Sequence, residues 1–492
     1  MRSTDRRLNA AVALTRFGLG ARPDEIDAVS VDPVAWLDAQ IRPEGAPPPQ
    51  GRFPDTDARL AQFEAYRRSA AEARRARAPA TEGGVAAPSS QAASPQDAAL
   101  AAREAQTQAR RTLYRETYQE FLARAQLGAS TPDGFAERWT LFWANLLTVS
   151  VTKLQSAVLL GQYEREAIRP HVFGQFEDLL LAAESHPAML YYLDQAQSVG
   201  PNSRAGQRRS AGLNENLARE ILELHTVGAD AGYSQTDVTE LARALTGWSV
   251  PGPAAPARRP NRRLAALADQ PGKRGFVFRP MQHEPGDRTI FGKRYADAGR
   301  AQGETVLRDL AGRPETARRL AKRLAVHFVA DDPPPALVQK LETAWTRSGG
   351  RLDEVARALI TAPESWAAQP VKVKTPYEFV ISTYRALGTT PQRPQALQGP
   401  LATLGQPAWA PPSPEGWPDT AADWAGPDAL VKRMEWAASV ADAARGSREP
   451  LQVAEAALGD RLSARTRTAV ARAESRPEAL TLFLMSPEFQ RR

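Results

Sequence analysis

The chain has 492 residues, of which 42% are hydrophobic and 24% are charged. This length and composition are typical of a large globular protein and exclude a chain that is disordered throughout. The absence of cysteine excludes disulfides, thiolate nucleophiles and cysteine-ligated metal sites. No apolar run is long enough to cross a bilayer, so we expect no transmembrane segment.

The formal net charge of +7 does not indicate a nucleic-acid-binding surface. The excess of basic residues comes from two segments, residues 66–111 and 251–275, and the remainder of the chain is close to neutral. Both segments look loop-like and lack the interleaved aromatic side chains on which bases stack. We therefore expect no nucleic-acid partner.

The first residues, MRSTDRRLNAAVALTRFGLG, contain an Arg-Arg pair before a short apolar run. A twin-arginine export signal has such a pair, but its apolar region spans about 7–15 residues, and Arg16 interrupts this one after about five. The pattern predicts the first turns of a folded helix instead. The sequence leaves two locations possible: the cytoplasm, or the periplasm reached by co-export with a partner that carries a twin-arginine signal.

Composition and apolar period divide the chain into consecutive segments. Apolar residues recur at helical spacing in most of them, and only GFVFRP and TIFGKRY alternate like strands. The sequence predicts a mainly α, multi-helix globular bundle with long Pro/Gly-rich loops and at most a small β-hairpin. In chain order we expect an N-terminal helical segment (1–77), a disordered Ala/Pro/Ser-rich insertion (78–100), a central helical core (101–250), a basic flexible insertion (251–275), a second helical part of the same core (276–388), a Pro-rich wrapping loop (389–425) and C-terminal helices (426–492).

Polar side chains crowd the stretch NENLAREILELHTVGADAGYSQTDVTELARALTGW, residues 214–248. Asn216, Glu220 and Glu223 share one face of the first predicted helix, and His225 lies in its last turn. Arg219 is placed for i,i+4 ion pairs on the same helix. Both a structural and a chemical role fit Asn216, Glu220 and Glu223, whereas helix capping and ion pairing are the simpler interpretation of Arg219 and His225. Glu220, Glu223 and His225 are candidate acid–base groups, and Asn216 and Arg219 are candidate binding residues.

The other candidates lie on loops or on aromatic positions. His283 and Glu284 occur together in a loop, where functional groups concentrate, so we add His283 to the acid–base candidates and Glu284 to the binding residues. Trp248 and Trp417 could each provide a platform for a sugar or an apolar group. His327 lies in an apolar helical pattern and is interpreted as a packed core histidine.

No metal site and no standard catalytic motif is predicted. Glu220 and His225 are five residues apart, and Glu223 and His225 two, so neither pair has the spacing that places two ligands on one helix face. The sequence also lacks a Gly-x-Ser-x-Gly elbow, a P-loop and a dinucleotide-binding glycine motif. It names no cofactor.

Several ordered blocks resemble a known bacterial family. These blocks are RFGLGARPDE, the stretch 212–248, FVFRPMQHEPGDRTIFG, HFVADDPPPALV, VKTPYEFV and PSPEGWPDT, and they span nearly the whole chain. Together they resemble the family catalogued as domain of unknown function 1800. The resemblance implies a large, mainly helical protein whose gene often neighbours a member of unknown-function family 1501, which is similar to sulfatases and phosphatases. It supplies no established catalytic residues.

Two functions follow as expectations. The first is a hydrolase-like enzyme that acts on an extracytoplasmic polymer or ester and uses acid–base groups from Glu220, Glu223, His225 and His283. The alternative is a non-catalytic partner or maturation factor for a co-encoded family 1501 protein. The first requires the acidic helix and the His283 loop to meet around a common cavity.

Overall fold

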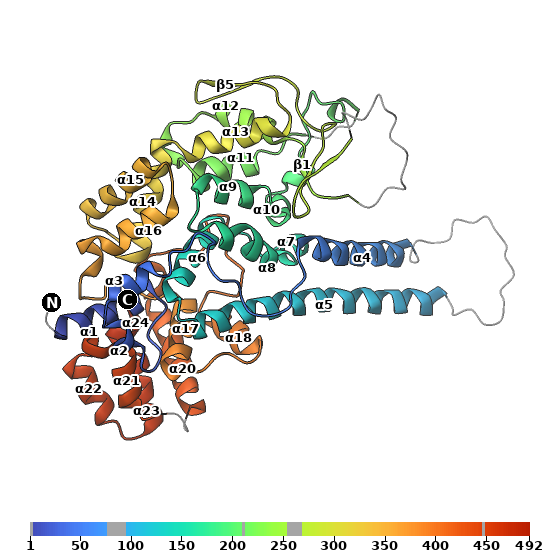
Figure 1. Cartoon of the computed structure of the whole chain (residues 1–492). Helices are drawn as coiled ribbons and strands as arrows, with labels where there is room; N and C mark the ends of the chain where they lie inside the picture. The colour runs from blue at the N-terminus through green and yellow to red at the C-terminus, as the bar shows by residue number, and fades with distance from the viewer. Residues whose placement is uncertain (1–2, 76–94, 209–211, 253–267, 445–447) are drawn as a thin grey trace.

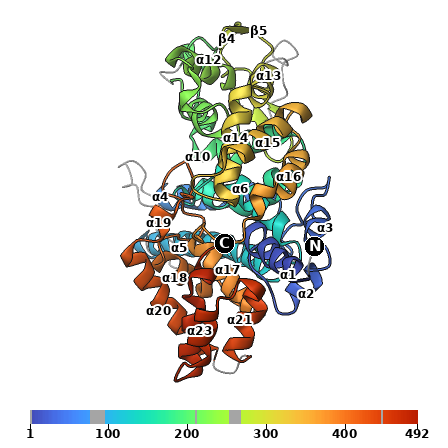
Figure 2. The ribbon, with the colours of Figure 1, turned by 90° about the vertical axis from the view of Figure 1, so that its left-hand side faces the viewer.

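The computed structural model describes residues 3–75, 95–208, 212–252, 268–444 and 448–492. It confirms the mainly helical fold class. Two lobes lie one above the other, and a pair of long antiparallel helices projects from their junction as an arm (Figure 1). Figure 2 shows α6 (Gly134–Leu146) between the two lobes. Among the described residues, no helix combines the length and apolar character needed to cross a bilayer.

The N-terminal helices pack in the lower lobe against the C-terminal ones (Figure 1). The first of them runs directly into a π-helical turn, Ala13–Phe17, and the Gly-rich turn after it contains Gly20 with φ +109°. A side chain at that position would be strained, so glycine is required there. The N-terminal helices are α1 (Ser3–Val12), α2 (Glu25–Val29) and α3 (Pro33–Asp38).

The arm consists of α4 (Thr56–Arg75) and α5 (Pro95–Ser130). Most of the predicted disordered insertion, residues 78–94, lies outside the described residues, whereas residues 95–100 form the start of α5. Proline at the first helical position followed by alanines, the best helix formers, explains this start. At the base of the arm the fully buried Arg59 pairs with Glu116 and Glu120.

The upper lobe is built from helices of the middle of the chain and two small antiparallel sheets. The helices preceding the sheets are α7 (Leu154–Ala157), α8 (Leu160–Tyr163), α9 (Phe176–Glu184), α10 (Pro187–Tyr192), α11 (Asn216–Glu220) and α12 (Gln235–Leu245). Those following them are α13 (Arg300–Ala311), α14 (Pro314–Phe328), α15 (Pro335–Ser348) and α16 (Leu352–Thr361). Two further π-helical turns, Glu164–Ile168 and Ile221–His225, extend α8 and α11.

The β structure differs in pairing from the predicted hairpin. In one sheet β3 (Val277–Phe278) lies between β1 (Trp248–Ser249) and β2 (Gln270–Pro271), and in the other β4 (Arg288–Ile290) pairs with β5 (Lys293–Tyr295). The segment FVF therefore pairs with residues just before the basic insertion and with residues near its end, and not with TIFGKRY. Residues 253–267 of that insertion lie outside the described residues, and its end contributes β2.

The lower lobe contains the remaining helices. They are α17 (Pro376–Leu387), α18 (Gln395–Thr403), α19 (Ala421–Trp424), α20 (Pro427–Ala443), α21 (Pro450–Leu458), α22 (Ala464–Ala471), α23 (Arg476–Leu484) and α24 (Pro487–Gln490). Their apolar core, which also includes part of α5, is separate from the larger core that extends from α1 to α16. The segment boundaries predicted from composition stay a prediction, but α17 packs with the C-terminal helices.

A buried ion cluster joins α6, α17 and the last residue of the chain. Glu378, in the first turn of α17, pairs with Arg138 of α6 and with Arg492, whose Nε lies 3.1 Å from its Oε2. All three side chains are buried. Burial alone would raise the pKa of Glu378, but the two guanidinium groups outweigh it and lower the pKa to about 2. Glu378 therefore remains ionised at every pH at which the protein is expected to be folded.

The Glu378→Gln variant should be strongly destabilised. It leaves two buried guanidinium groups without their shared carboxylate, and breaking a buried pair costs about 3–5 kcal/mol. The midpoint of urea unfolding measures the loss. Glu455→Gln is the matched control, because it removes an exposed pair with Arg467 worth at most about 1 kcal/mol. Equal losses in the two variants would contradict this assignment.

Candidate functional site

The polar residues of the acidic helix form a network at the protein surface. Arg219 on α11 lies 3.2 Å from Glu215 and 3.5 Å from Glu223, and Glu223 also accepts a 2.6 Å hydrogen bond from the hydroxyl of Tyr233. Asn216 donates its backbone N–H to Asn214 Oδ1 at the start of the helix. These contacts hold α11 on the turn before α12.

His225 and Glu220 lie deeper in the same region. Nδ1 of His225 lies 2.7 Å from Oε1 of Glu184 on α9, and both side chains are completely buried. Burial raises the pKa of Glu220, and the neighbouring Glu223 raises it further. The structure thus brings Glu220, Glu223 and His225 together, but it ties His225 to Glu184 in the interior of the lobe.

His283 and Glu284 brace a different part of the upper lobe. Nδ1 of His283 donates to the backbone oxygen of Thr246 at 2.8 Å, and its Nε2 lies 3.9 Å from Asp297. Glu284 accepts hydrogen bonds from both the backbone and the side chain of Asn202. These contacts fasten the loop to the end of α12 and to the segment around residue 202.

Trp248 is buried in β1, with its ring edge-on to Phe276 at 5.5 Å between centroids. The ring therefore packs in the upper lobe, and its role as a binding platform stays a prediction. Within the described ranges, no three His, Asp or Glu side chains gather in a way that could hold a metal ion.

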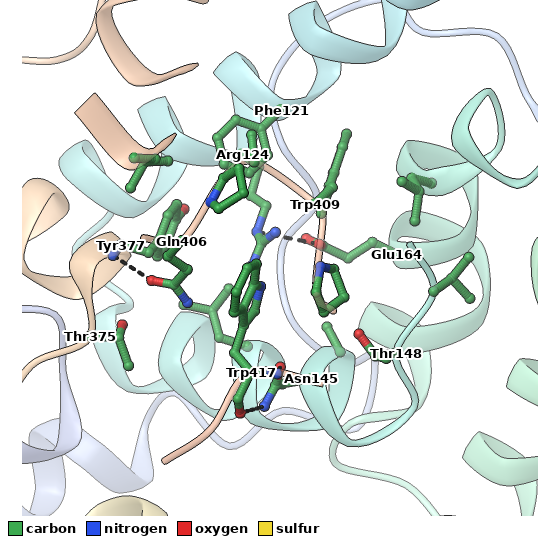
Figure 3. Close-up of a pocket in the computed structure, with 18 of the residues that line it drawn as sticks. Phe121, Arg124, Asn145, Thr148, Glu164, Thr375, Tyr377, Gln406, Trp409 and Trp417 are labelled. Carbon is green, nitrogen blue, oxygen red and sulfur yellow. Dashed lines mark hydrogen bonds and ion pairs between the residues drawn. The ribbon is translucent and has the colours of Figure 1, made fainter. Parts of the chain in front are cut away.

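A cavity of about 110 Å³ lies where the two lobes meet the base of the arm. None of the four acid–base candidates from the sequence lines it, but Trp417 does. Its walls come from α5, α6, the end of α8, the end of α14, the start of α17 and the segment of residues 405–420, here called the tryptophan loop (Figure 3). One water molecule needs about 10–15 Å³, so the cavity has room for a ligand group of several atoms.

His327 and Asp419 form a hydrogen-bonded pair in the cavity wall. Nδ1 of His327, on the last turn of α14, lies 2.9 Å from Oδ2 of Asp419 in the tryptophan loop. The other ring nitrogen, Nε2, is buried and has no hydrogen-bond partner among the described residues. The rings of Phe142 and Phe328 pack on the imidazole at 5.3 and 4.9 Å and fix its orientation.

The electrostatics of this pair favour a neutral histidine beside an ionised aspartate. Burial lowers the pKa of His327, against the opposing effect of Asp419. Burial acts to raise the pKa of Asp419, but His327, Lys372 and Arg492 outweigh it and hold that pKa well below its usual range. A neutral imidazole that donates from Nδ1 carries its lone pair on Nε2. This is the arrangement of a general base oriented by a carboxylate.

Arg124 also lines the cavity, and Figure 3 shows it reaching from α5 toward Gln406 and Trp409. Its guanidinium carbon lies 5.0 Å from the ring centroid of Tyr377, 5.7 Å from that of Phe121 and 5.9 Å from that of Trp409. Cation–π contacts on this scale stabilise a fixed, planar guanidinium. Its Nε lies 3.3 Å from Glu164.

The tryptophan loop is anchored on α6. Asn145 donates from Nδ2 to the backbone oxygen of Trp417 at 2.9 Å and accepts from the backbone N–H of Trp417 at 2.8 Å (Figure 3). Gly416 has φ +84°, and a Cβ there would lie 2.5 Å from the backbone oxygen of Asn145. Trp409 also has a positive φ, of 51°, while its carbonyl accepts from the N–H of Val151. Asn145 and glycine at 416 therefore place Trp417 and, two residues on, Asp419.

Of the candidates predicted from the sequence, Trp417 lines this cavity, whereas the other principal lining residues are not predicted. The predicted packing of His327 in an apolar core agrees with its contacts to two phenylalanines. The available signal was a carboxylate two residues after the tryptophan in PSPEGWPDT, a loop rich in turn-forming residues. Its pairing with a histidine 92 residues earlier in the chain is a product of the tertiary fold.

We expect the Asn145→Ala variant to free the tryptophan loop while the rest of the fold persists. It removes two hydrogen bonds, each worth about 0.5–1.5 kcal/mol. Hydrogen–deuterium exchange should therefore rise in peptides covering residues 411–420 and stay unchanged in α14. Asn202→Ala, which loosens the distant Glu284 contact, is the control. Unchanged exchange of the loop in Asn145→Ala would show that other contacts hold it.

Comparison with known proteins identifies the family. The family profile described as "Protein of unknown function (DUF1800)" matches residues 12–491, nearly the whole chain. No curated protein and no solved structure matches the chain. The chain therefore belongs to the DUF1800 family.

Proposed function

We propose that the protein is a hydrolase-like enzyme whose active site is the cavity between His327 and Arg124. The observation that carries this proposal is the 2.9 Å contact between His327 Nδ1 and Asp419, which leaves Nε2 without a partner in a cavity wall. In this proposal His327 is the acid–base group, in place of the candidates predicted from the sequence, Glu220, Glu223, His225 and His283. Asp419 orients the imidazole and stabilises its protonated form.

Water is the nucleophile in the proposed reaction, because no serine or threonine hydroxyl is within hydrogen-bonding distance of His327 among the described residues. Nε2 of His327 takes a proton from water as the water oxygen bonds to the acyl carbon of an ester. The bond between that carbon and the alcohol oxygen then breaks, and His327 returns the proton to the alcohol. Arg124, which lines the same cavity, supplies positive charge to the substrate end group.

The size of the cavity limits the substrate. About 110 Å³ accommodates an acyl group or the end of a longer molecule, and the partly exposed ring of Trp417 offers a flat surface beside it. An ester carried on a larger molecule fits better than cleavage within a polymer chain. The extracytoplasmic location of such a substrate stays a prediction.

The alternative function, a non-catalytic partner or maturation factor for a family 1501 protein, also stays a prediction. Co-purification of the two full-length proteins distinguishes it from the enzyme. A complex that forms equally well with His327→Gln, together with no turnover by the wild-type chain, would favour the partner function.

His327→Gln and Asp419→Asn should both lose esterase activity. Removing a general base costs about 10²–10⁴-fold in rate, so we expect at least a hundredfold fall in kcat/KM on acetyl esters. Circular dichroism and the unfolding midpoint verify that the variants are folded. Glu220→Gln tests the earlier candidate site and should retain activity. Loss of activity in Glu220→Gln but not in His327→Gln would place the chemistry on the acidic helix.

The pH dependence of kcat/KM should report the pKa of His327. Activity requires the neutral imidazole, and burial lowers its pKa below the ordinary value of about 6.5, so the acid limb should lie below pH 6.5. Asp419→Asn removes a charge that raises this pKa, so residual activity should have its acid limb at still lower pH. Measurement of kcat/KM between pH 4.5 and 8 tests this prediction. A limb above pH 7, or one shifted upward in Asp419→Asn, would contradict the assignment.

A further inference from the structure

The cavity wall offers hydrogen-bond donors that no protein group accepts. In the described part of the chain, neither Nη1 nor Nη2 of Arg124 donates a hydrogen bond, although carboxylate groups line the same cavity. Gln406 uses its oxygen to accept the backbone N–H of Tyr377 at 2.7 Å, which leaves its amide NH₂ without an acceptor. The hydroxyl of Thr148 likewise has no hydrogen-bond partner among the residues that the structure describes. All three side chains line the cavity shown in Figure 3.

The carboxylate and amide acceptors of Glu378 and Asn145 in the same wall are already occupied. Glu378 accepts from Arg138, Arg492 and the backbone of Thr375. Both atoms of the Asn145 amide are bound to the backbone of Trp417. The lone pair of His327 Nε2 is used in the proposed reaction, and the unpartnered hydroxyl of Tyr377 can donate as well as accept. A ligand that satisfies Arg124, Gln406 and Thr148 must therefore supply oxygen acceptors.

The carboxylate beside Arg124 is also shared with a second cation. Nε of Arg124 lies 3.3 Å from Oε2 of Glu164, whose Oε1 lies 2.7 Å from Nη2 of Arg169. Arg169 is in turn held by Glu137 at 2.8 Å. The terminal nitrogens of Arg124 form no hydrogen bond within the part of the chain that the structure describes, and three aromatic rings pack around the planar guanidinium and orient it.

We infer that the cavity recognises an anionic oxygen group, a carboxylate or a phosphate-type monoester, which binds in bidentate fashion to the terminal nitrogens of Arg124. Gln406 and Thr148 supply further hydrogen bonds. A guanidinium fork matches the two oxygens of such a group, and charge-assisted hydrogen bonds of this kind are roughly twice as strong as neutral ones. The inference rests on the proposed function in taking this cavity as the substrate site, and it names the substrate as an ester that carries a negative charge.

The test compares two probes of the same shape that differ in charge, acetate and acetamide, by isothermal titration calorimetry at constant ionic strength. Acetate should bind the full chain at least about tenfold more tightly than acetamide, since charge-assisted hydrogen bonds are roughly twice as strong as neutral ones. Inorganic phosphate is the second arm. Tighter binding of acetate indicates a carboxylate, and tighter binding of phosphate indicates a phosphate-type group.

Arg124→Gln should abolish the preference for acetate, whereas Arg115→Gln, an exposed position on the same helix, should retain it. If Arg124→Gln does not fold, Thr148→Val decides, because Thr148 has no hydrogen bond to lose in the free protein. It should weaken binding of the preferred anion about three- to tenfold. Equal binding of the two matched probes, or an unchanged preference in Arg124→Gln, overturns the inference, as does unaltered affinity in Thr148→Val when that variant decides.

The outcomes separate this inference from the proposed function. Selective anion binding by a chain that hydrolyses none of the tested esters would retain the anion site and remove the hydrolase. Hydrolysis of neutral esters that depends on His327, without any preference for anionic probes, would retain the hydrolase and remove the anion site.

Discussion

The carboxylate of Glu378 holds together parts of the chain that lie far apart in the sequence. It completes the capping box of α17 with Thr375 and at the same time neutralises Arg138 and Arg492. One buried anion therefore fixes a helix start, the helix between the lobes and the last residue of the chain. Arg138 and Arg492 could not both be buried here without this carboxylate, because an unpaired charge in the interior costs several kcal/mol. The cavity lies against this cluster.

The same cluster determines the chemistry that the cavity can support. Arg492 donates to the backbone oxygen of His327 at 2.5 Å and lies 4.0 Å from Asp419. It therefore positions both members of the pair while adding positive charge that keeps Asp419 ionised. The ion pairs of Glu378 and the imidazole of His327 share the charges of Arg138 and Arg492. Substitutions around Glu378 will therefore also alter the basicity of His327.

The sequence predicted the fold class and much of the helical content because those depend on local patterns. Ser234 and Asp237 form a capping box at the start of α12, and Thr375 with Glu378 forms another by the same rule. The candidate site could not be predicted in this way. Glu223 and His225 are conspicuous in the sequence because polar residues cluster there, yet Glu223 contacts Arg219 and Tyr233, and His225 contacts Glu184. Arg124 and His327 are isolated in the sequence, and only the tertiary fold brings them to the same cavity.

The anchoring of the tryptophan loop on α6 has a consequence for how the protein is made. Asn145 and Trp417 are separated by 272 positions, and Arg124 precedes Asp419 by more. A chain emerging from the ribosome must therefore release both lobes before these partners can meet, and contacts of such long range form slowly. Until then the indole rings of Trp409 and Trp417 are exposed to solvent. A chain in which the two lobes have not yet come together should accordingly leave the cavity unformed and depend on chaperones.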